Sequence, residues 1–143
     1  MDIARAIGRR MGRKLAHVKP HNPLLVPVPL HWRRHLMRRY NQAEELAKWI
    51  AFYEELDYIP DALRRIKATH SLDNFDAERR QEIVSDAIAA NPRGIEQLKG
   101  RNVVLIDDVL TTGATLESCT RALLGGGAAR VDIMVLARAR KEY

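Results

Sequence analysis

The chain has a single cysteine and no long apolar run. Cys119 has no second cysteine with which to form an intramolecular disulfide, and one thiolate cannot complete a zinc cluster. No apolar segment approaches the roughly 20 residues that cross a bilayer, and the first residues lack the apolar core of a secretory signal. We therefore expect a cytoplasmic protein without a membrane span, in which Cys119 is a small buried side chain and not a nucleophile.

Acidic residues are nearly absent from the first 40 positions, where Asp2 stands against ten lysines and arginines. The later residues hold 14 basic and 17 acidic groups, so the net charge of +6 combines +9 with −3. A positive field at one end of the molecule attracts polyanions, and phosphates are the natural partner. One basic set is expected to solvate the outer face of a helix: Arg5, Arg9, Arg13 and Lys14. A second set, in a loop, fits solvation and phosphate binding equally well: Arg33, Arg34, Arg38 and Arg39.

The length of 143 residues, with 46% apolar and 29% charged residues, is typical of one globular domain. We expect a single domain over residues 1–143. Apolar residues at steps of three or four predict an amphipathic helix over residues 2–18. Its buried stripe is expected to contain Ile3, Ile7, Met11, Leu15 and Val18.

The middle of the chain predicts short elements joined by polar loops. Residues 24–28 predict a strand that lies at a sheet edge or stops abruptly, because Pro27 has no N–H to donate. A helix is expected from Asn41, with Glu44 completing a capping box. Its buried stripe is expected to contain Ala43, Leu46, Ala47, Ile50 and Tyr53. Beyond it we expect minor strands at 63–66 and 87–90, a polar loop at 67–76, a short helix from Asp76 to about Val84, and a turn at 91–94.

The last third of the chain predicts a βαβ unit. Residues 102–106 form an aliphatic run of the kind buried on both faces of a parallel sheet. A helix over 114–124, ended by three glycines, and a strand over 131–136 follow. The fold class is therefore α/β, with a mainly parallel central sheet flanked by helices. Ligands in such sheets bind at the carboxyl ends of strands, where we expect the loop 107–115.

This loop combines two kinds of ligand-binding group. Asp107 and Asp108 are adjacent carboxylates, of which at least one can face the cleft and accept hydrogen bonds from a sugar diol. The residues that follow have short side chains, so that backbone N–H groups and a helix dipole can enclose a phosphate: Thr111, Thr112, Gly113, Ala114 and Thr115. In the alternative interpretation Thr112 or Thr115 only caps the helix, which explains single residues but not the whole string.

The string from Val103 to Thr115 resembles the phosphoribosyl pyrophosphate (PRPP) motif of type I phosphoribosyltransferases: four aliphatic residues, two acids and then Thr-Thr-Gly-Ala-Thr. Residues 26–31, 39–43, 78–80 and 126–131 are similar to the ComF competence-protein branch of that superfamily. The resemblance implies a type I phosphoribosyltransferase fold with 103–115 as its PRPP loop. ComF proteins usually begin with a four-cysteine zinc ribbon, which this chain lacks, as a short natural variant or a fragment would.

The resemblance also implies roles for the site residues. Asp107 and Asp108 would be catalytic and would bind the ribose 5-phosphate together with residues 111–115. The pyrophosphate would be held by Leu30, His31, Arg33 and Arg34. A mobile lid over 67–80 would close the site with Lys67, Thr69, Arg79 and Arg80. Residues 1–20 would form a hood for the acceptor, and Mg²⁺ would bind with the donor, with no direct protein ligand or with the two aspartates through water.

Two functions follow from this resemblance. The first is transfer of the phosphoribosyl group to an unknown nitrogenous acceptor in nucleotide metabolism, with pyrophosphate release. Candidate bases are the histidines, whose ordinary pKa lies near neutrality: His31, His35 and His70. The second is a non-catalytic role in DNA uptake, binding PRPP, single-stranded DNA or a helicase partner, with Trp32 and Tyr40 as stacking residues. A homodimer is compatible with either function.

Overall fold

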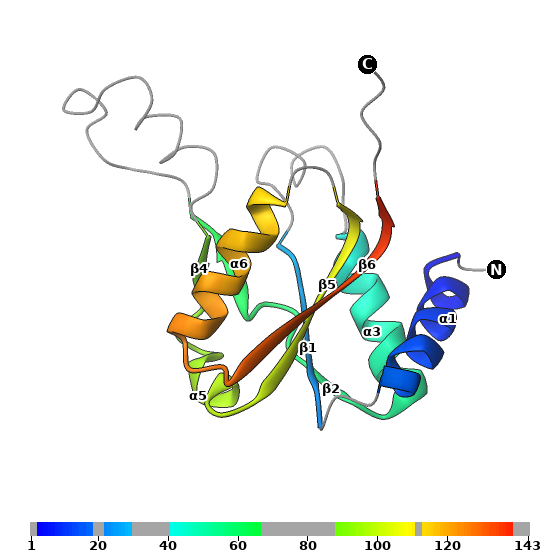
Figure 1. The fold of residues 1–143 in the computed structure, drawn as a ribbon, viewed down its shortest axis with the longest axis horizontal. Helices are drawn as coiled ribbons and strands as arrows, with labels where there is room; N and C mark the ends of the chain where they lie inside the picture. Colours follow the sequence, from blue (N-terminus) through cyan, green and yellow to red (C-terminus); the bar gives the residue numbers. More distant parts are fainter. Residues whose placement is uncertain (1–2, 19–21, 30–40, 67–87, 111–112, 139–143) are drawn as a thin grey trace, which may run out of the picture.

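A four-stranded parallel sheet lies at the centre of the computed structural model, which describes residues 3–18, 22–29, 41–66, 88–110 and 113–138 (Figure 1). Its strands, in the order β2-β1-β5-β6, are β2 (Asp57–Tyr58), β1 (Leu24–Pro27), β5 (Asn102–Leu110) and β6 (Arg130–Arg138). A separate antiparallel pair consists of β3 (Leu63–Arg65) and β4 (Ile88–Ala90). The helices are α1 (Ile3–Val18), α3 (Gln42–Glu54), α5 (Ile95–Leu98) and α6 (Ala114–Gly125). The α/β class and the parallel central sheet are confirmed.

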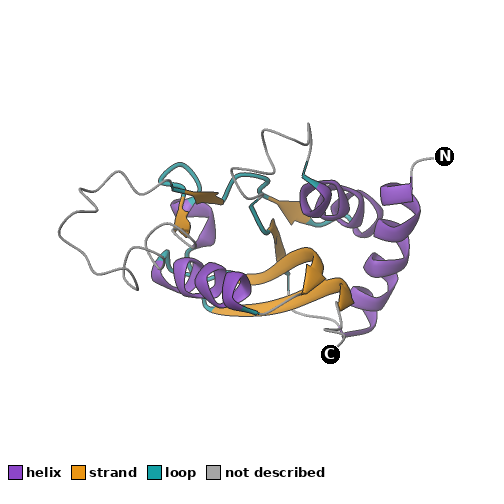
Figure 2. Ribbon diagram, turned by 90° about the horizontal axis from the view of Figure 1, so that it is seen from above, coloured by secondary structure: helices purple, strands orange, loops and turns teal. Residues whose placement is uncertain are grey.

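Helices cover both faces of this sheet, which explains why Leu24–Val26 of β1 and Val103–Ile106 of β5 are aliphatic and buried (Figures 1 and 2). Alternate strand residues enter two separate apolar clusters. The cluster under α6 includes Val26, Val103, Leu105, Leu116, Cys119 and Leu123. The cluster under α3 and α1 includes Leu25, Val104, Ile106, Leu46, Ile50, Met11 and Leu15. The expected burial of Cys119 is confirmed.

Strand β1 is central and stops at Pro27, so the second of the two predicted alternatives, an abrupt stop, is confirmed. The backbone of Val28 donates to Ile106 on the β5 side, and Leu25 accepts from Ile59 on the β2 side. Because parallel strands alternate the side to which each residue bonds, the nitrogen of Pro27 faces the β2 side. Strand β2 pairs only with Leu24 and Leu25, so the missing N–H falls where that partner has already ended.

Helices α1 and α3 pack against each other more closely than the apolar stripes in their sequences indicated. A Cβ atom added at Gly8 would lie 2.6 Å from the Cβ of Trp49, and one at Gly12 would lie 2.9 Å from a side-chain carbon of Glu54. The stripe residues Met11 and Leu15 are buried as expected. Two other stripe assignments were wrong: Ile3 is 74% exposed, and Tyr53 is only half-buried.

The minor elements agree with the sequence in part. Strands β3 and β4 and the turn at 91–94 lie where they were expected, with Gly94 donating to Asn91 across the turn at 2.9 Å. Strand β2 and helix α5 were not expected. The proposed helix from Asp76 lies outside the described residues. Among the helices that the structure describes, none is long and apolar enough to cross a membrane.

Candidate functional site

The carboxyl end of β1 lies beside the middle of β5. The Val28 N–H donates to the carbonyl of Ile106 at 2.8 Å, and Pro27 is in register with Ile106. The chain that continues from Pro29 therefore leaves the sheet beside Asp107. The expected pyrophosphate residues lie in this continuation, but Leu30, His31, Arg33 and Arg34 are outside the described residues.

We call residues 30–40, which follow β1 and Pro29, the basic segment. Asn41 comes directly after this segment and hydrogen-bonds back to the end of β1. Its Nδ2 donates to the carbonyl of Val28 at 2.9 Å, and its Oδ1 accepts from the backbone N–H of Ala43 at 2.9 Å. The first bond links the end of the segment back to the end of β1, and the second caps α3. Asn41 was predicted as a cap, although its side chain bonds to Ala43 and not to Glu44, which a capping box would require. Its bond to Val28 was not predicted.

Arg65 lies two residues before the expected lid over 67–80, and it contacts Pro29, directly before the basic segment. Its Nε donates to the carbonyl of Pro29 at 3.0 Å. Strand β3 pairs with β4 in a register that sets Arg65 opposite Ile88. The chain between these two residues therefore leaves and returns at one point, close to the start of the basic segment. Lys67, Thr69, Arg79 and Arg80 of the lid lie within it, outside the described residues.

The two carboxylates lie within β5, so their placement in a loop after the strand was wrong. The aliphatic run ends at Ile106, but β6 continues the pairing in the same register, to Val135 opposite Asp107 and Arg138 opposite Leu110. A continuing neighbour holds polar residues in strand geometry as firmly as apolar ones, because the pairing uses only backbone groups.

Strand alternation places these two side chains on opposite faces of the sheet. Asp107 follows Val103 and Leu105 on the face that α6 covers, and Asp108 follows Val104 and Ile106 on the face that α3 covers. Asp107 also accepts a bond from the backbone N–H of Asp108 at 2.9 Å. The pair therefore presents one carboxylate on each face of the sheet, just beyond the point where β1 ends.

The N-terminus of α6 lies on the same face as Asp107. Its N-cap is Gly113, whose φ of 82° is in the left-handed region that favours glycine. Neither Thr112 nor Thr115 is therefore the cap residue, and Glu117 closes the first turn by donating to Gly113 at 2.9 Å. The first backbone N–H groups of a helix have no partner within the helix, and the positive end of its dipole lies there. Such an end binds phosphate. Thr111 and Thr112 lie outside the described residues.

The metal-binding side chains available at this site fit a magnesium ion that is held mainly by oxygen atoms of a bound substrate. The described residues contain no group of three or more His, Cys, Asp or Glu side chains that could hold a metal. Asp107 and Asp108, on opposite faces, are also poorly arranged to chelate one ion together. Mg²⁺ commonly keeps several waters and binds through one or two carboxylates plus substrate phosphates. The residues present fit that mode.

Glu44 lies one turn into α3 from Asn41 and has an altered acidity. Partial burial raises its pKa above the ordinary 4.5, and the carboxylates of Glu45 and Asp61 raise it further. Its position in the first turn favours a negative charge and partly offsets these effects. A carboxyl group that holds its proton more readily than usual therefore lies close to the end of the basic segment.

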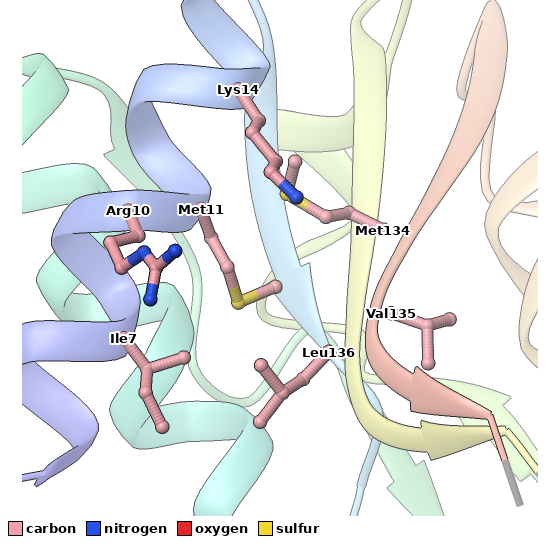
Figure 3. Close-up of a pocket in the computed structure, with 7 residues that line it drawn as sticks. All are labelled: Ile7, Arg10, Met11, Lys14, Met134, Val135 and Leu136. Atoms are coloured by element: carbon pink, nitrogen blue, oxygen red, sulfur yellow. The ribbon is translucent and has the colours of Figure 1, made fainter.

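Two cavities among the described residues have no aspartate in their lining, although the first borders Val135, which pairs with Asp107. One of about 180 Å³ lies between α1 and β6, where Met134 and Leu136 point toward α1 and Val135 points away (Figure 3). Its remaining lining residues are Ile7, Arg10, Met11 and Lys14. The other, of about 300 Å³, is lined by α1 and Tyr53. The candidate bases His31, His35 and His70 and the stacking residues Trp32 and Tyr40 are outside the described residues.

Residues 41–143 match the family model described as "Phosphoribosyl transferase domain". This range contains Asn41, Arg65, both aspartates and the N-terminus of α6. The chain is also 30% identical over 142 residues to "DNA utilization protein YhgH" of Escherichia coli K12, covering 96% of this chain and 61% of that protein. It is 30% identical over 115 residues to "Competence protein F" of Haemophilus influenzae, covering 80% of this chain and 50% of that protein. The chain thus spans between half and two thirds of the length of these relatives.

Solved structures show the same fold. Glutamine phosphoribosylpyrophosphate amidotransferase from Bacillus subtilis matches with a TM-score of 0.62 at 15% identity. The match covers 93% of this chain and 26% of that one. At this identity the similarity concerns the fold alone, and it agrees with a type I phosphoribosyltransferase architecture.

Proposed function

Because the chain belongs to the phosphoribosyl transferase domain family, in its ComF branch, we propose that it binds PRPP with Mg²⁺ and transfers the phosphoribosyl group. The acceptor is a nitrogen nucleophile, and pyrophosphate is released. The observation that carries the proposal is the bond from Val28 to Ile106, which sets the start of the basic segment beside Asp107. The donor has a diphosphate, a ribose diol and a 5-phosphate in that order. The basic segment, the carboxylates and the α6 N-terminus offer matching groups in the same order.

Each part of the donor then has a set of proposed binding groups. The 5-phosphate binds the N-terminus of α6 and its preceding turn: Thr111, Thr112, Gly113, Ala114 and Thr115. The ribose hydroxyls donate to Asp107 and Asp108. The pyrophosphate binds the segment after β1: Leu30, His31, Arg33 and Arg34.

A bound Mg²⁺ would neutralise charge on the diphosphate, with ligands from donor oxygens, water and Asp107 or Asp108 through water. The nitrogen lone pair forms a bond to C1 of the ribose as the bond from C1 to the diphosphate oxygen breaks. Pyrophosphate leaves with the electron pair of that bond, and the nitrogen then loses a proton to a base or to water. Positive charge develops on the ribose during this step, and nearby carboxylates stabilise it.

A further set of residues positions these binding groups and excludes water. Asn41 and Arg65 fix the two ends of the basic segment, which reduces the disorder that donor binding must remove. The lid residues Lys67, Thr69, Arg79 and Arg80 would close over the donor. Closure favours the acceptor over water as the nucleophile, so that transfer is faster than hydrolysis.

A non-catalytic role in DNA uptake is the second candidate, and the names of the relatives from Escherichia coli and Haemophilus influenzae favour it. In that role the same site would bind PRPP as a ligand without turnover. Binding and pyrophosphate release therefore have to be measured separately.

The test is incubation of the protein with PRPP, Mg²⁺ and a panel of bases and amines, with pyrophosphate release as the readout. The control is the Asp107→Asn/Asp108→Asn variant, prepared in the same way. Acceptor-dependent release by the native chain alone supports transfer. Donor binding without release for any acceptor supports the non-catalytic role, and absence of donor binding overturns both.

A further inference from the structure

The outer face of α1 carries a second concentration of positive charge. The helix contains arginine or lysine at five positions and no aspartate or glutamate: Arg5, Arg9, Arg10, Arg13 and Lys14. Arg5, Arg9 and Arg13 follow one another at intervals of four residues, so they form a row about 12 Å long on one side of the helix. All three are exposed. From the sequence alone, Arg5, Arg9, Arg13 and Lys14 were interpreted as a solvated face.

Aromatic side chains of α3 hold two of these arginines in place. The Arg5 guanidinium lies 5.0 Å from the ring centre of Trp49, and its Nε donates to the Tyr53 hydroxyl at 2.7 Å. The Arg9 guanidinium lies 5.6 Å from the ring centre of Tyr53. Stacking uses the flat face of a guanidinium, whereas its N–H donors point outward in the plane. The arginines are thus partly ordered before any anion binds.

These residues surround a cavity of about 300 Å³, whose lining contains no carboxylate: Arg5, Ala6, Arg9, Arg10, Arg13 and Tyr53. Outside the lining, the side chain of Glu54 lies against Gly12 of the same helix. Four arginine side chains line this one concave surface, and Arg5, Arg9 and Arg13 are exposed, which suits a ligand with more than one negative charge. An aromatic ring at the same surface suits a ligand that also has a flat ring.

We propose that this surface, the α1 arginine face (Arg5, Arg9, Arg10, Arg13 and Tyr53), binds the phosphates and base of nucleotides. Guanidinium groups contact phosphate oxygens in pairs, and the base stacks on Tyr53 or on a guanidinium plane. A free nucleoside triphosphate and a single strand of nucleic acid both supply this chemistry. The part of this face formed by Arg9, Arg13 and Tyr53 lies away from the start of α3, because Tyr53 is about 16 Å along α3 from Gln42, whereas Arg10 also lines the cavity against β6. The proposal does not depend on the proposed function.

The test compares two double variants that remove equal charge. Arg9→Ala/Arg13→Ala removes two exposed arginines of the α1 arginine face and spares Arg5, which contacts Trp49 and donates to the Tyr53 hydroxyl. Arg93→Ala/Arg130→Ala removes two exposed arginines elsewhere. Binding of a fluorescein-labelled thymidine 12-mer and of ATP is measured by anisotropy and calorimetry at several salt concentrations.

The first variant is expected to lose at least tenfold in affinity for one or both ligands, and the control less than twofold. For the 12-mer, the slope of log affinity against log salt should become shallower by about 1.4, or roughly 0.7 for each lost phosphate contact. The ligand that responds identifies the source of the phosphates. Equal losses in both variants, or no binding of either ligand by the native chain at low salt, would overturn the proposal. Loss of binding in Asp107→Asn/Asp108→Asn would also overturn it, because that result assigns the ligand to the other site.

Discussion

Replacing Gly8 by alanine is expected to destabilise the domain, although alanine is the better helix former. The added Cβ would lie 2.6 Å from the Cβ of Trp49 and 3.4 Å from the carbonyl oxygen of Leu46. Neither atom can rotate away, so α1 and α3 must separate or shift. Overpacking of this kind costs typically 1–3 kcal/mol, and a contact between two Cβ atoms belongs in the upper part of that range. Helix propensity returns about 1 kcal/mol.

The net expectation is a loss of about 1–2 kcal/mol in the free energy of unfolding, or roughly 3–6 °C in Tm. Urea unfolding measures it, as a lower midpoint with an unchanged m-value. Gly125→Ala is the matched control, because Gly125 is helical and an added Cβ there has no atom within 4 Å. If Gly8→Ala proves as stable as Gly125→Ala, then α1 does not pack on α3 as described. In that case α3 would not hold the side chains of Arg5 and Arg9 in place either.

Three further substitutions test the site. Asn41→Ala should cost about 1–2 kcal/mol of stability through the lost cap, measured by urea unfolding, and should weaken PRPP binding in calorimetry because its bond to Val28 is also lost. Unchanged donor affinity would show that this bond does not position the basic segment. Arg65→Met should weaken PRPP binding severalfold, and Arg64→Met, an exposed neighbour, should not; equal effects would reduce the role of Arg65 to its charge. The raised pKa of Glu44 means that its protonated carboxyl group favours the folded state. This contribution to stability is lost as the pH rises above 4.5 through the folded-state pKa. In urea unfolding, the stability of Glu44→Gln should therefore equal that of the native chain below this pH range and exceed it at neutral pH. The opposite order would contradict the raised pKa.

Local sequence patterns predicted most of the core, and long-range pairing explains where they failed. The aliphatic run of β5 was visible, but its end was placed at Ile106 because the next two residues are acidic. The structure continues β5 to Leu110, since β6 continues to pair with it at Asp107, Val109 and Leu110. Strand β2 has only two residues, one of them Asp57, and forms because Leu24 and Leu25 lie beside it. No period in the sequence signals a strand so short.

The candidate site was also predicted from the sequence only in part. The string from Asp107 to Thr115 was visible because its residues are adjacent in the chain and their types are unusual together. The bonds from Asn41 to Val28 and from Arg65 to Pro29 join residues 13 and 36 positions apart, so only the fold brings them together. The α1 arginine face depends on Tyr53, 48 residues from Arg5. A charge pattern on one helix could not show that a second helix holds its side chains.

The most direct measurement is calorimetry of PRPP binding with Mg²⁺ to the native chain and to Asp107→Asn/Asp108→Asn. Hydrogen bonds to charged groups contribute about 1.5–3 kcal/mol each, so loss of both carboxylates should weaken binding by about a hundredfold or more. The double variant should unfold in urea at the native midpoint, and Asp132→Asn, a carboxylate near the start of β6, should bind like the native chain. Native affinity in the double variant, with the fold intact, would contradict the assignment of β5 and the α6 N-terminus as the PRPP site.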